Sequence, residues 1–435
     1  MNELKALKID FRDAISLDPQ EVVVFGVDIS SQPGWGANAL KNDPFLWSKC
    51  SRALPIAREE DIVVLLGKLD EQYYQWIRNL GLGPAHIVEY GEMAPKNPLA
   101  ECIAMNPTPV QEAIARTGRK PLFVPFYSGQ MEQRAAKSLN AKLYGGAPEK
   151  IIKKYFQKDS FKNECIRLGI PVVEGEVLQS SGKKGVLDKS EFAKLVSTML
   201  RNYPAAVVRG SEGAGGSSVY TVTEDDVQKI YYEIKACRPD NYLIEPLLQV
   251  VASPNDQWVV SHDGAIRHLE LSAQLFEGLK HAGNLRGQYF APRVEQYIFE
   301  TSAAIMQQMA EDGYQGVAGI DYIVCDEGIF PIENNARVNG STFAVNLVDR
   351  LQRRHKERIK CWKFFKAETD PCSYAELVRR IESVLYDLSK PNAVFPIDCD
   401  TLPYNGKFSP VIIAEDIYHI QHLERALREL GVTRV

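Results

Sequence analysis

The first 145 residues alternate short apolar runs with longer segments of mixed polarity. Such runs between amphipathic segments are typical of an open α/β sheet whose strands are buried on both faces. The pattern therefore predicts a Rossmann-like layer over residues 1–145. The layer has no G-x-G-x-x-G fingerprint, so dinucleotide binding is not predicted. The predicted strands are residues 21–26, 61–66, 85–90 and 121–125.

A turn cluster at residues 145–148 predicts a domain boundary, and a helix that carries Lys158 follows it. Residues 203–209 then form an apolar run that leads into the small-residue segment 210–218 and a second run, 219–222. Glycine lets backbone N–H groups approach phosphates closely, so this predicted hairpin is either a phosphate-binding segment or a simple mobile turn. It lacks the Gly-Lys-Ser/Thr ending of a Walker loop.

The next apolar run, residues 241–248, carries Glu245 and a proline that cannot donate a ladder hydrogen bond. The proline should end the strand and leave backbone groups free for a ligand such as adenine. Asp256 stands at the entrance of a predicted hairpin, 257–264. Residues 274–286 are predicted to be a polar loop that either lines a substrate pocket, through Lys280, His281 and Arg286, or is solvated.

A second acidic hairpin is predicted from two strand-like runs that flank an Asp-Glu-Gly turn at residues 326–328. It should bring Asp321 beside Glu333 and Asn335, and the alternation of Glu333, Asn335 and Arg337 points these three side chains to one face. Oxygen ligands of this kind suit Mg²⁺. An ordinary acidic surface turn is the alternative interpretation.

The remaining pattern predicts a long amphipathic helix over about 293–312 and a basic cluster, 350–360, on a solvated helix face. A helix over about 374–388 comes next. The closing segment should form a small α/β appendage with strands near 393–396 and 410–414 and a helix over 417–430.

Composition narrows the class of protein. A chain of 435 residues is longer than the length at which a single hydrophobic core stops growing, so two to four domains are expected. The formal net charge of -5 gives no general attraction for nucleic acid or anionic membranes. No signal peptide and no spanning apolar run is present, which predicts a cytoplasmic protein. The eight scattered cysteines form no Cys-x-x-Cys pair and are expected to be reduced.

The order of these motifs over residues 146–345 resembles the ATP-grasp superfamily, in which the nucleotide lies between two α+β subdomains. The resemblance implies an α/β and α+β chain with the ATP-grasp fold. Its expected parts are an N-terminal Rossmann-like (pre-ATP-grasp) domain, 1–145; a small subdomain with a glycine-rich lid, 146–250; a large subdomain with the magnesium site, 251–365; and a C-terminal α/β appendage, 366–435.

The resemblance also assigns roles to individual residues. Lys158 matches a lysine that touches the nucleotide phosphates, although Gln157 replaces the usual preceding aspartate. Arg209 matches a phosphate-binding cation that is usually lysine. The other implied ligands are Gly213, Gly215, Gly216 and Ser217 in the lid, Glu245 and Leu247 at adenine, Asp256 at the ribose, and Asp321, Glu333 and Asn335 at two Mg²⁺ ions.

The flanking segments are similar to the subgroup that contains the pheganomycin peptide ligase and its carrier-protein-charging relatives in natural product biosynthesis. This implies an ADP-forming ligase that joins an amino acid or peptide carboxylate to an amine through an acylphosphate. Catalysis would rest on Arg337, Glu333 and Asn335. Transfer to an acyl carrier protein thiol and a nucleotide-binding protein without turnover remain alternatives, and so does a homodimer.

Overall fold

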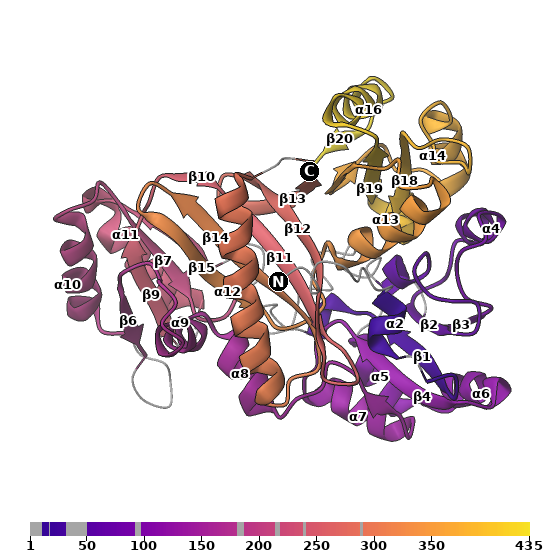
Figure 1. The fold of residues 1–435 in the computed structure, drawn as a ribbon, viewed down its shortest axis with the longest axis horizontal. Coiled ribbons are helices and arrows are strands. Elements are labelled where there is room, and N and C mark those ends of the chain that lie inside the picture. The colour runs from indigo at the N-terminus through magenta and orange to yellow at the C-terminus, as the bar shows by residue number, and fades with distance from the viewer. Residues whose placement is uncertain are drawn as a thin grey trace.

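The computed structural model describes residues 11–16, 18–31, 50–91, 97–180, 187–213, 218–237, 241–287 and 290–435. Figure 1 shows three sheets side by side: an N-terminal sheet in indigo and purple, a small sheet in magenta, and a large orange sheet that continues into the yellow C-terminal elements. No helix of the described part is long and apolar enough to cross a membrane.

The N-terminal layer is a five-stranded parallel sheet with strand order β3-β2-β1-β4-β5. All four strands predicted from the apolar runs are confirmed. The strands are β1 (Glu21–Gly26), β2 (Ile62–Leu66), β3 (His86–Tyr90), β4 (Lys120–Pro125) and β5 (Lys142–Leu143). The helices are α2 (Phe11–Ile15), α4 (Glu71–Asn79), α5 (Leu99–Met105), α6 (Thr108–Thr117) and α7 (Gln130–Ser138). The central strands are buried on both faces, as their unbroken apolar runs require.

The small sheet is antiparallel, with strand order β6-β9-β7-β8. Its strands are β6 (Glu176–Gln179), β7 (Ala206–Gly210), β8 (Val219–Val222) and β9 (Asn241–Pro246). Helices α10 (Lys189–Leu200) and α11 (Val227–Cys237) pack on it around a separate apolar core that includes Phe192 and Val208. Helices α8 (Glu149–Phe156) and α9 (Lys158–Arg167) connect it to the N-terminal layer. The predicted β7–β8 hairpin is confirmed.

The large sheet has eleven strands in the described part of the chain. Its central strands are β10 (Val250–Ala252), β11 (Pro254–Val260), β12 (Ile266–Glu277), β13 (Lys280–Arg286), β14 (Gly316–Cys325) and β15 (Gly328–Asn335). The C-terminal strands are β16 (Cys361–Phe365), β17 (Ala367–Glu368), β18 (Ala393–Ile397), β19 (Lys407–Ala414) and β20 (Thr433–Arg434). Helix α12 (Pro292–Glu311) covers one face of the central strands (Figure 1), where Phe299 packs on Trp258.

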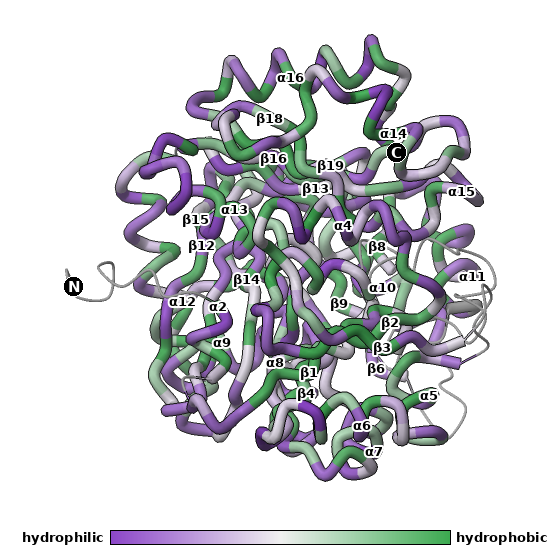
Figure 2. Tube along the Cα trace, turned by 90° about the vertical axis from the view of Figure 1, so that its right-hand side faces the viewer, coloured by the Kyte–Doolittle hydropathy of each residue, from purple (hydrophilic) through white to green (hydrophobic). Residues whose placement is uncertain are grey.

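The remaining helices lie around the C-terminal strands. They are α13 (Thr342–Arg354), α14 (Tyr374–Ile381), α15 (Leu402–Asn405) and α16 (Ile417–Glu429). Figure 2 shows hydrophobic and hydrophilic positions alternating along α16, whose Ile420, Leu423 and Leu427 are buried. This is the pattern of a helix that packs one face on a sheet.

Three predictions need correction. Residues 274–286 are not a polar loop, because they lie in the β12–β13 hairpin, whose turn holds Gly278 at a φ of 59°. Helix α14 ends at Ile381 rather than near residue 388. The basic cluster is not a uniformly solvated face: Arg350 donates to the Pro55 and Ala57 carbonyls and Arg354 to the Leu80 and Gly81 carbonyls. These arginines satisfy backbone carbonyls of the N-terminal layer.

A buried ion pair joins the N-terminal layer to the C-terminal strands. Arg52 donates to Asp398 through Nε (2.8 Å) and Nη2 (2.6 Å), and both side chains are buried. Arg52 also donates to the Gly340 carbonyl at 3.2 Å, and Ser409 donates to Asp398 at 2.7 Å. One guanidinium therefore fixes the N-terminal layer, the β18–β19 region and the segment after β15 to one another.

We expect Arg52→Met to destabilise the protein by about 3 kcal/mol, because it leaves the buried Asp398 carboxylate without its cation. Urea denaturation of the purified variant measures this change. Arg116→Met is the control, since Arg116 is exposed and lies 3.9 Å from Glu112 on a helix surface, where ion pairs contribute little. A wild-type free energy of unfolding for Arg52→Met would contradict the structural role of this ion pair.

Candidate functional site

Two carboxylates and an amide lie together on the β14–β15 hairpin. Asp321 and Glu333 are direct cross-strand partners, with a β-bulge between Asp321 and Tyr322. Asn335 is the last residue of β15, and its Nδ2 donates to Asp321 Oδ2 at 3.0 Å. The hairpin pattern in the sequence predicted this proximity. Directly opposite side chains on an antiparallel pair lie close enough to share one ligand.

Asp321 is only 8% exposed and accepts a second hydrogen bond from Asn255 Nδ2, at 2.6 Å. Burial raises the pKa of Asp321 to about 7, and the negative charge of Glu333 adds to the effect. The protein thus holds two adjacent carboxyl groups in a poorly solvated place, where a nearby positive charge favours their ionised forms.

Lys158 approaches this pair from α9, on the side of the small sheet. It is the first residue of α9, is 4% exposed, and places Nζ 3.4 Å from Glu333 Oε1. Its backbone N–H donates to the Ser211 carbonyl at 3.0 Å, at the base of the glycine-rich segment. Gln157, where the family usually has aspartate, donates to Glu212 at 2.9 Å. The start of α9 is therefore fixed both to the segment that follows β7 and to β15.

Arg209, near the end of β7, also bridges the two sheets. Its Nη1 donates to the Ile332 carbonyl on β15 at 2.9 Å, while Nε and Nη2 donate to Glu245 Oε2 at 2.9 and 2.6 Å. Lys162 donates to the other oxygen of Glu245 at 2.8 Å. Burial alone would raise the pKa of Glu245, but Arg209 and Lys162 hold it below its ordinary value. Two cations thus share one buried carboxylate.

Lys162 was missed as a site residue by the sequence reasoning. A signal was present, because Lys162 lies four residues after Lys158 and the two share one face of a helix. Glu245, predicted to contact adenine, has both carboxylate oxygens bonded to cations. Leu247, the second predicted adenine contact, follows β9 and is 36% exposed. Glu245 lies near the end of β9, an inner strand of the small sheet, and Leu247 follows this strand.

Arg337 lies beyond the end of β15, not on the strand as the alternation predicted, but its side chain still meets Asn335. Its Nη2 donates to Asn335 Oδ1 at 2.7 Å and its Nη1 to the Val338 carbonyl at 3.0 Å. The guanidinium lies 5.1 Å from the Phe126 ring centroid and 5.9 Å from that of Phe156. Among the residues that the structure describes, its buried Nε has no hydrogen-bond partner. Burial lowers the pKa of Arg337.

Asp256 corrects a prediction. Neighbouring residues on a strand point to opposite faces, and Asn255 is the one that faces Asp321. Asp256 accepts hydrogen bonds from Trp258 at 2.6 Å and His268 at 2.8 Å on the side of α12. It therefore does not line the same face as the carboxylate pair, and the ribose role is not supported.

The other predicted residues have mixed outcomes. Gly213 lies in the described segment after β7, whereas Gly215, Gly216 and Ser217 lie outside the described residues. Of the candidate pocket residues, Lys280 is exposed, His281 contacts Asn284 at 3.0 Å, and Arg286 lies 3.1 Å from Glu270. All three are strand residues of β13.

The oxygen donors of this cluster fit a hard divalent ion. In the part of the chain that the structure describes, no three His, Cys, Asp or Glu side chains are arranged to hold a metal. A bound ion would rely on Asp321, Glu333 and the Asn335 amide oxygen, with the remaining ligands from phosphates or water. Few protein ligands of this kind suit Mg²⁺. The lysine 3.4 Å from Glu333 shows that the pair already attracts positive charge.

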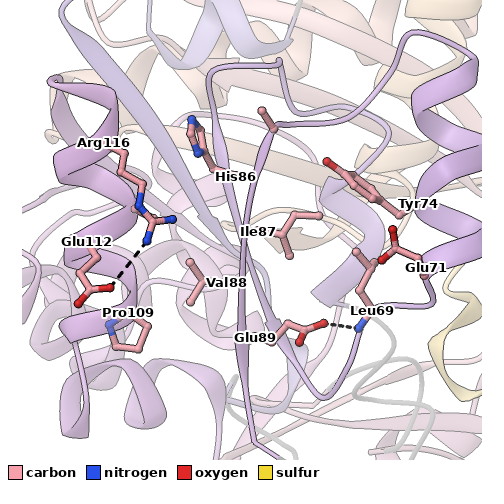
Figure 3. Close-up of a pocket in the computed structure, with 12 residues that line it drawn as sticks. Leu69, Glu71, Tyr74, His86, Ile87, Val88, Glu89, Pro109, Glu112 and Arg116 are labelled. Carbon is pink, nitrogen blue, oxygen red and sulfur yellow. Dashed lines mark hydrogen bonds and ion pairs between the residues drawn. The ribbon is translucent and has the colours of Figure 1, made fainter.

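A separate cavity of about 560 Å³ lies on the N-terminal layer, beside β3 and between α4 and α6. Figure 3 shows the residues that line it. Its charged groups are engaged locally, since Glu89 accepts from the Leu69 backbone at 2.7 Å and Glu112 lies 3.9 Å from Arg116. The cavity does not contain the residues described above, so the candidate site is the cluster around Asp321 and Glu333.

Part of the chain matches a known protein family, and its fold is similar to that of solved structures. Residues 185–335 match the family model of L-aspartate–L-methionine ligase of the ATP-grasp type. The chain resembles the biotin carboxylase of Campylobacter jejuni, whose structure was solved as a β,γ-ATP complex. The TM-score is 0.59 and the sequence identity is 15%, and the match covers 95% of this chain and 92% of the carboxylase.

Two further structures are similar. The biotin carboxylase domain of Hydrogenobacter thermophilus 2-oxoglutarate carboxylase, solved with MgADP, ADP and bicarbonate, has TM-score 0.59 and 14% identity over 96% and 91% of the two chains. The N5-carboxyaminoimidazole ribonucleotide synthetase of Thermus thermophilus has TM-score 0.55 and 11% identity over 94% and 98%. At these identities the likeness establishes the fold. The fold is the ATP-grasp fold that the motif order predicted, and residues 185–335 match a model of ATP-grasp ligases.

The raised pKa of Asp321 predicts a pH-dependent stability in the metal-free protein. Folded Asp321 keeps its proton up to about pH 7, whereas the unfolded chain loses it near pH 4, so this group makes the folded state less stable as the pH rises between these values. The free energy of unfolding of Asp321→Asn, minus that of wild type, should therefore increase by up to about 4 kcal/mol from pH 4 to pH 8.

Urea denaturation in the presence of EDTA measures this difference. The exposed Asp326, at the turn of the same hairpin, changed to Asn serves as the control. A difference between Asp321→Asn and wild type that stays flat with pH would show that the carboxyl group is not held protonated by its surroundings.

Proposed function

We propose that this protein is an ATP-dependent, ADP-forming ligase that joins an amino acid or peptide carboxylate to an amine through an acylphosphate. One observation carries the proposal: Lys158 and Arg209 from the small-sheet side converge on the β14–β15 hairpin that holds Asp321 and Glu333. Two cations on one wall and two carboxylates on the other suit a nucleotide with its metal ions between them.

In this proposal Lys158 and Arg209 bind the phosphates that do not react. Asp321, Glu333 and Asn335 hold Mg²⁺, with two ions expected, and the metal supplies charge neutralisation on the transferred phosphoryl group. The segment 210–218, part of which lies outside the described residues, covers the phosphates and excludes water. Its base is fixed to α9 by the bond from Lys158 N–H to the Ser211 carbonyl, at 3.0 Å.

Arg337 is proposed to hold the substrate carboxylate. Its guanidinium is oriented by Asn335 and by the rings of Phe126 and Phe156, while its Nε–H lacks a partner. A guanidinium can bind a carboxylate or phosphate with two parallel hydrogen bonds, which fixes the reacting oxygen. The residue thus lies where the nucleotide side of the cleft meets the N-terminal layer.

The reaction balances without a covalent enzyme intermediate. A carboxylate oxygen attacks the γ-phosphorus, the bond to the β–γ bridging oxygen breaks, and ADP leaves. The amine nitrogen then attacks the acyl carbon, phosphate departs with the former carboxylate oxygen, and the nitrogen loses a proton to water. Arg337 is positioned to stabilise the developing oxyanion in the second step.

The substrates are the finer part of the proposal. The family model is named for a ligase of L-aspartate and L-methionine, so this pair is the first to test, followed by other amino acids and short peptides. We expect phosphate release that depends on both substrates, with ADP rather than AMP as coproduct. Hydroxylamine should trap the acylphosphate as a hydroxamate. A product that forms only with a carrier protein would replace the amine acceptor with a thiol.

Glu333→Gln should lower Mg²⁺-dependent ADP release at least 100-fold, because it removes one of the two carboxylates that hold the metal. A coupled assay for ADP measures the rate. Glu327→Gln, at the exposed turn of the same hairpin, should retain wild-type turnover. Unchanged turnover in Glu333→Gln would remove the hairpin from the mechanism, and a wild type without turnover on any carboxylate would favour a nucleotide-binding protein.

A further inference from the structure

A buried hydrogen-bond network extends from the carboxylate pair to the segment that carries Arg337. Asn255 Nδ2 donates to Asp321 at 2.6 Å, and Gln257 Nε2 donates to Asn255 Oδ1 at 3.0 Å. Thr342 Oγ1 donates to Gln257 Oε1 at 2.7 Å. Thr342 in turn accepts the backbone N–H of Asn339 at 2.9 Å. We call Asn255, Gln257, Thr342 and Asn339 the buried network.

The network is closed at its far end on Arg337. Asn339 Nδ2 donates to the Arg337 carbonyl at 3.0 Å, and Gln257 Nε2 also donates to Ser341 at 2.8 Å. Asn339 lies directly on β14 at Gly319, where a Cβ atom would come within 2.4 Å of Asn339 Oδ1. The missing side chain of Gly319 thus lets the segment 337–342 lie against the strand that carries Asp321.

When Asp321 is ionised, as it would be with a bound metal, the direction of the bonds follows from it. An ionised carboxylate can only accept, so Asn255 turns its nitrogen to Asp321 and its oxygen to the nitrogen of Gln257. The oxygen of Gln257 then accepts from the Thr342 hydroxyl, which in turn accepts from the Asn339 backbone N–H. Reversing one amide would leave buried donors and acceptors unpaired.

The buried network also leaves the negative charge of Asp321 uncompensated at the proposed metal site. Asn255 and Gln257 are 3% and 0% exposed, so they are fully removed from solvent beside Asp321. Neutral amides orient the carboxylate without cancelling its charge, whereas a buried lysine or arginine there would compete with a divalent ion. Amide groups at this place therefore serve the metal better than a cation would.

We propose that Asn255 and Gln257 are positioning residues that fix Asp321 and the segment 337–342 relative to each other. Binding of a divalent ion at Asp321 is therefore coupled to the position of Arg337. The inference rests on the proposed nucleotide and metal site, and it adds the residues that link the metal to the substrate arginine. Neither residue needs to touch nucleotide or substrate.

The test uses binding and needs no substrate. Mn²⁺ replaces Mg²⁺, and its electron paramagnetic resonance signal reports free ion during titration of the full-length protein with ADP present. Gln257→Met, which keeps the side-chain length but removes both the oxygen and the nitrogen of the amide, should weaken Mn²⁺ binding at least tenfold. ADP binding in EDTA, measured by calorimetry, should stay within twofold of wild type.

The matched control is Tyr322→Phe. Tyr322 follows Asp321 on β14, is equally buried, and contacts Ser302 at 2.8 Å on the opposite face of the sheet. Losing this bond should leave Mn²⁺ binding within twofold. Hydrogen exchange supplies a second readout: Mn²⁺ with ADP should protect amides of residues 337–342 in wild type, and this protection should be lost in Gln257→Met at saturating Mn²⁺.

The outcomes are distinct. Wild-type Mn²⁺ affinity and protection in Gln257→Met would overturn the inference, and so would an equal loss of metal-free ADP binding, which would indicate a general structural defect. If Gln257→Met does not fold, as judged by circular dichroism, Thr342→Val tests the same network from its other end with the same expectations. A wild type that binds no Mn²⁺ with ADP would instead contradict the proposed function.

Discussion

The structure depends on the direct pairing of Asp321 with Glu333 across an antiparallel hairpin. Two carboxyl groups at this separation repel each other when both are ionised, and the burial of Asp321 removes part of the water that would screen them. Four nearby side chains offset this repulsion with a positive charge or an N–H donor. Lys158 approaches Glu333, amides of Asn255 and Asn335 bind Asp321, and Arg337 binds Asn335.

These interactions also explain how the small sheet is held against the large sheet. Lys158 and Arg209 belong to the small-sheet side but contact residues of β15, so part of the attraction between the two sheets is electrostatic. Glu245 accompanies Arg209 and Lys162, which keeps that cationic wall from carrying two uncompensated buried charges. A polyphosphate with a divalent ion would satisfy both walls at once. The fold thus presents opposite charges on facing walls before a ligand binds.

Much of this arrangement was predictable because it is local in sequence. The N-terminal strands, the β7–β8 hairpin and the Asp321–Glu333 hairpin follow from short periodic runs and turn residues. Features that depend on long-range pairing were not predictable. The face of Asp256 depends on the register of β11 against β14, and a shift of one residue exchanges Asp256 with Asn255.

The same limit applies to the partners of buried groups. The carbonyls that Arg350 and Arg354 bind lie more than 250 residues away in sequence, and the buried network joins residues on β11 to the start of α13. No local pattern marks such pairs. Residues 274–286 were misjudged because the polar side chains of the β12–β13 hairpin give it the composition of a loop, and its pairing is visible only in the structure.

The central claim is that the cleft transfers the γ-phosphoryl group of ATP to a carboxylate. The most direct measurement uses the amino acid that supports ADP release, labelled with ¹⁸O in its carboxylate, followed by mass spectrometry of the products. The account predicts that one ¹⁸O atom appears in the released phosphate and none in the nucleotide. Label in AMP, or phosphate without label, would contradict it.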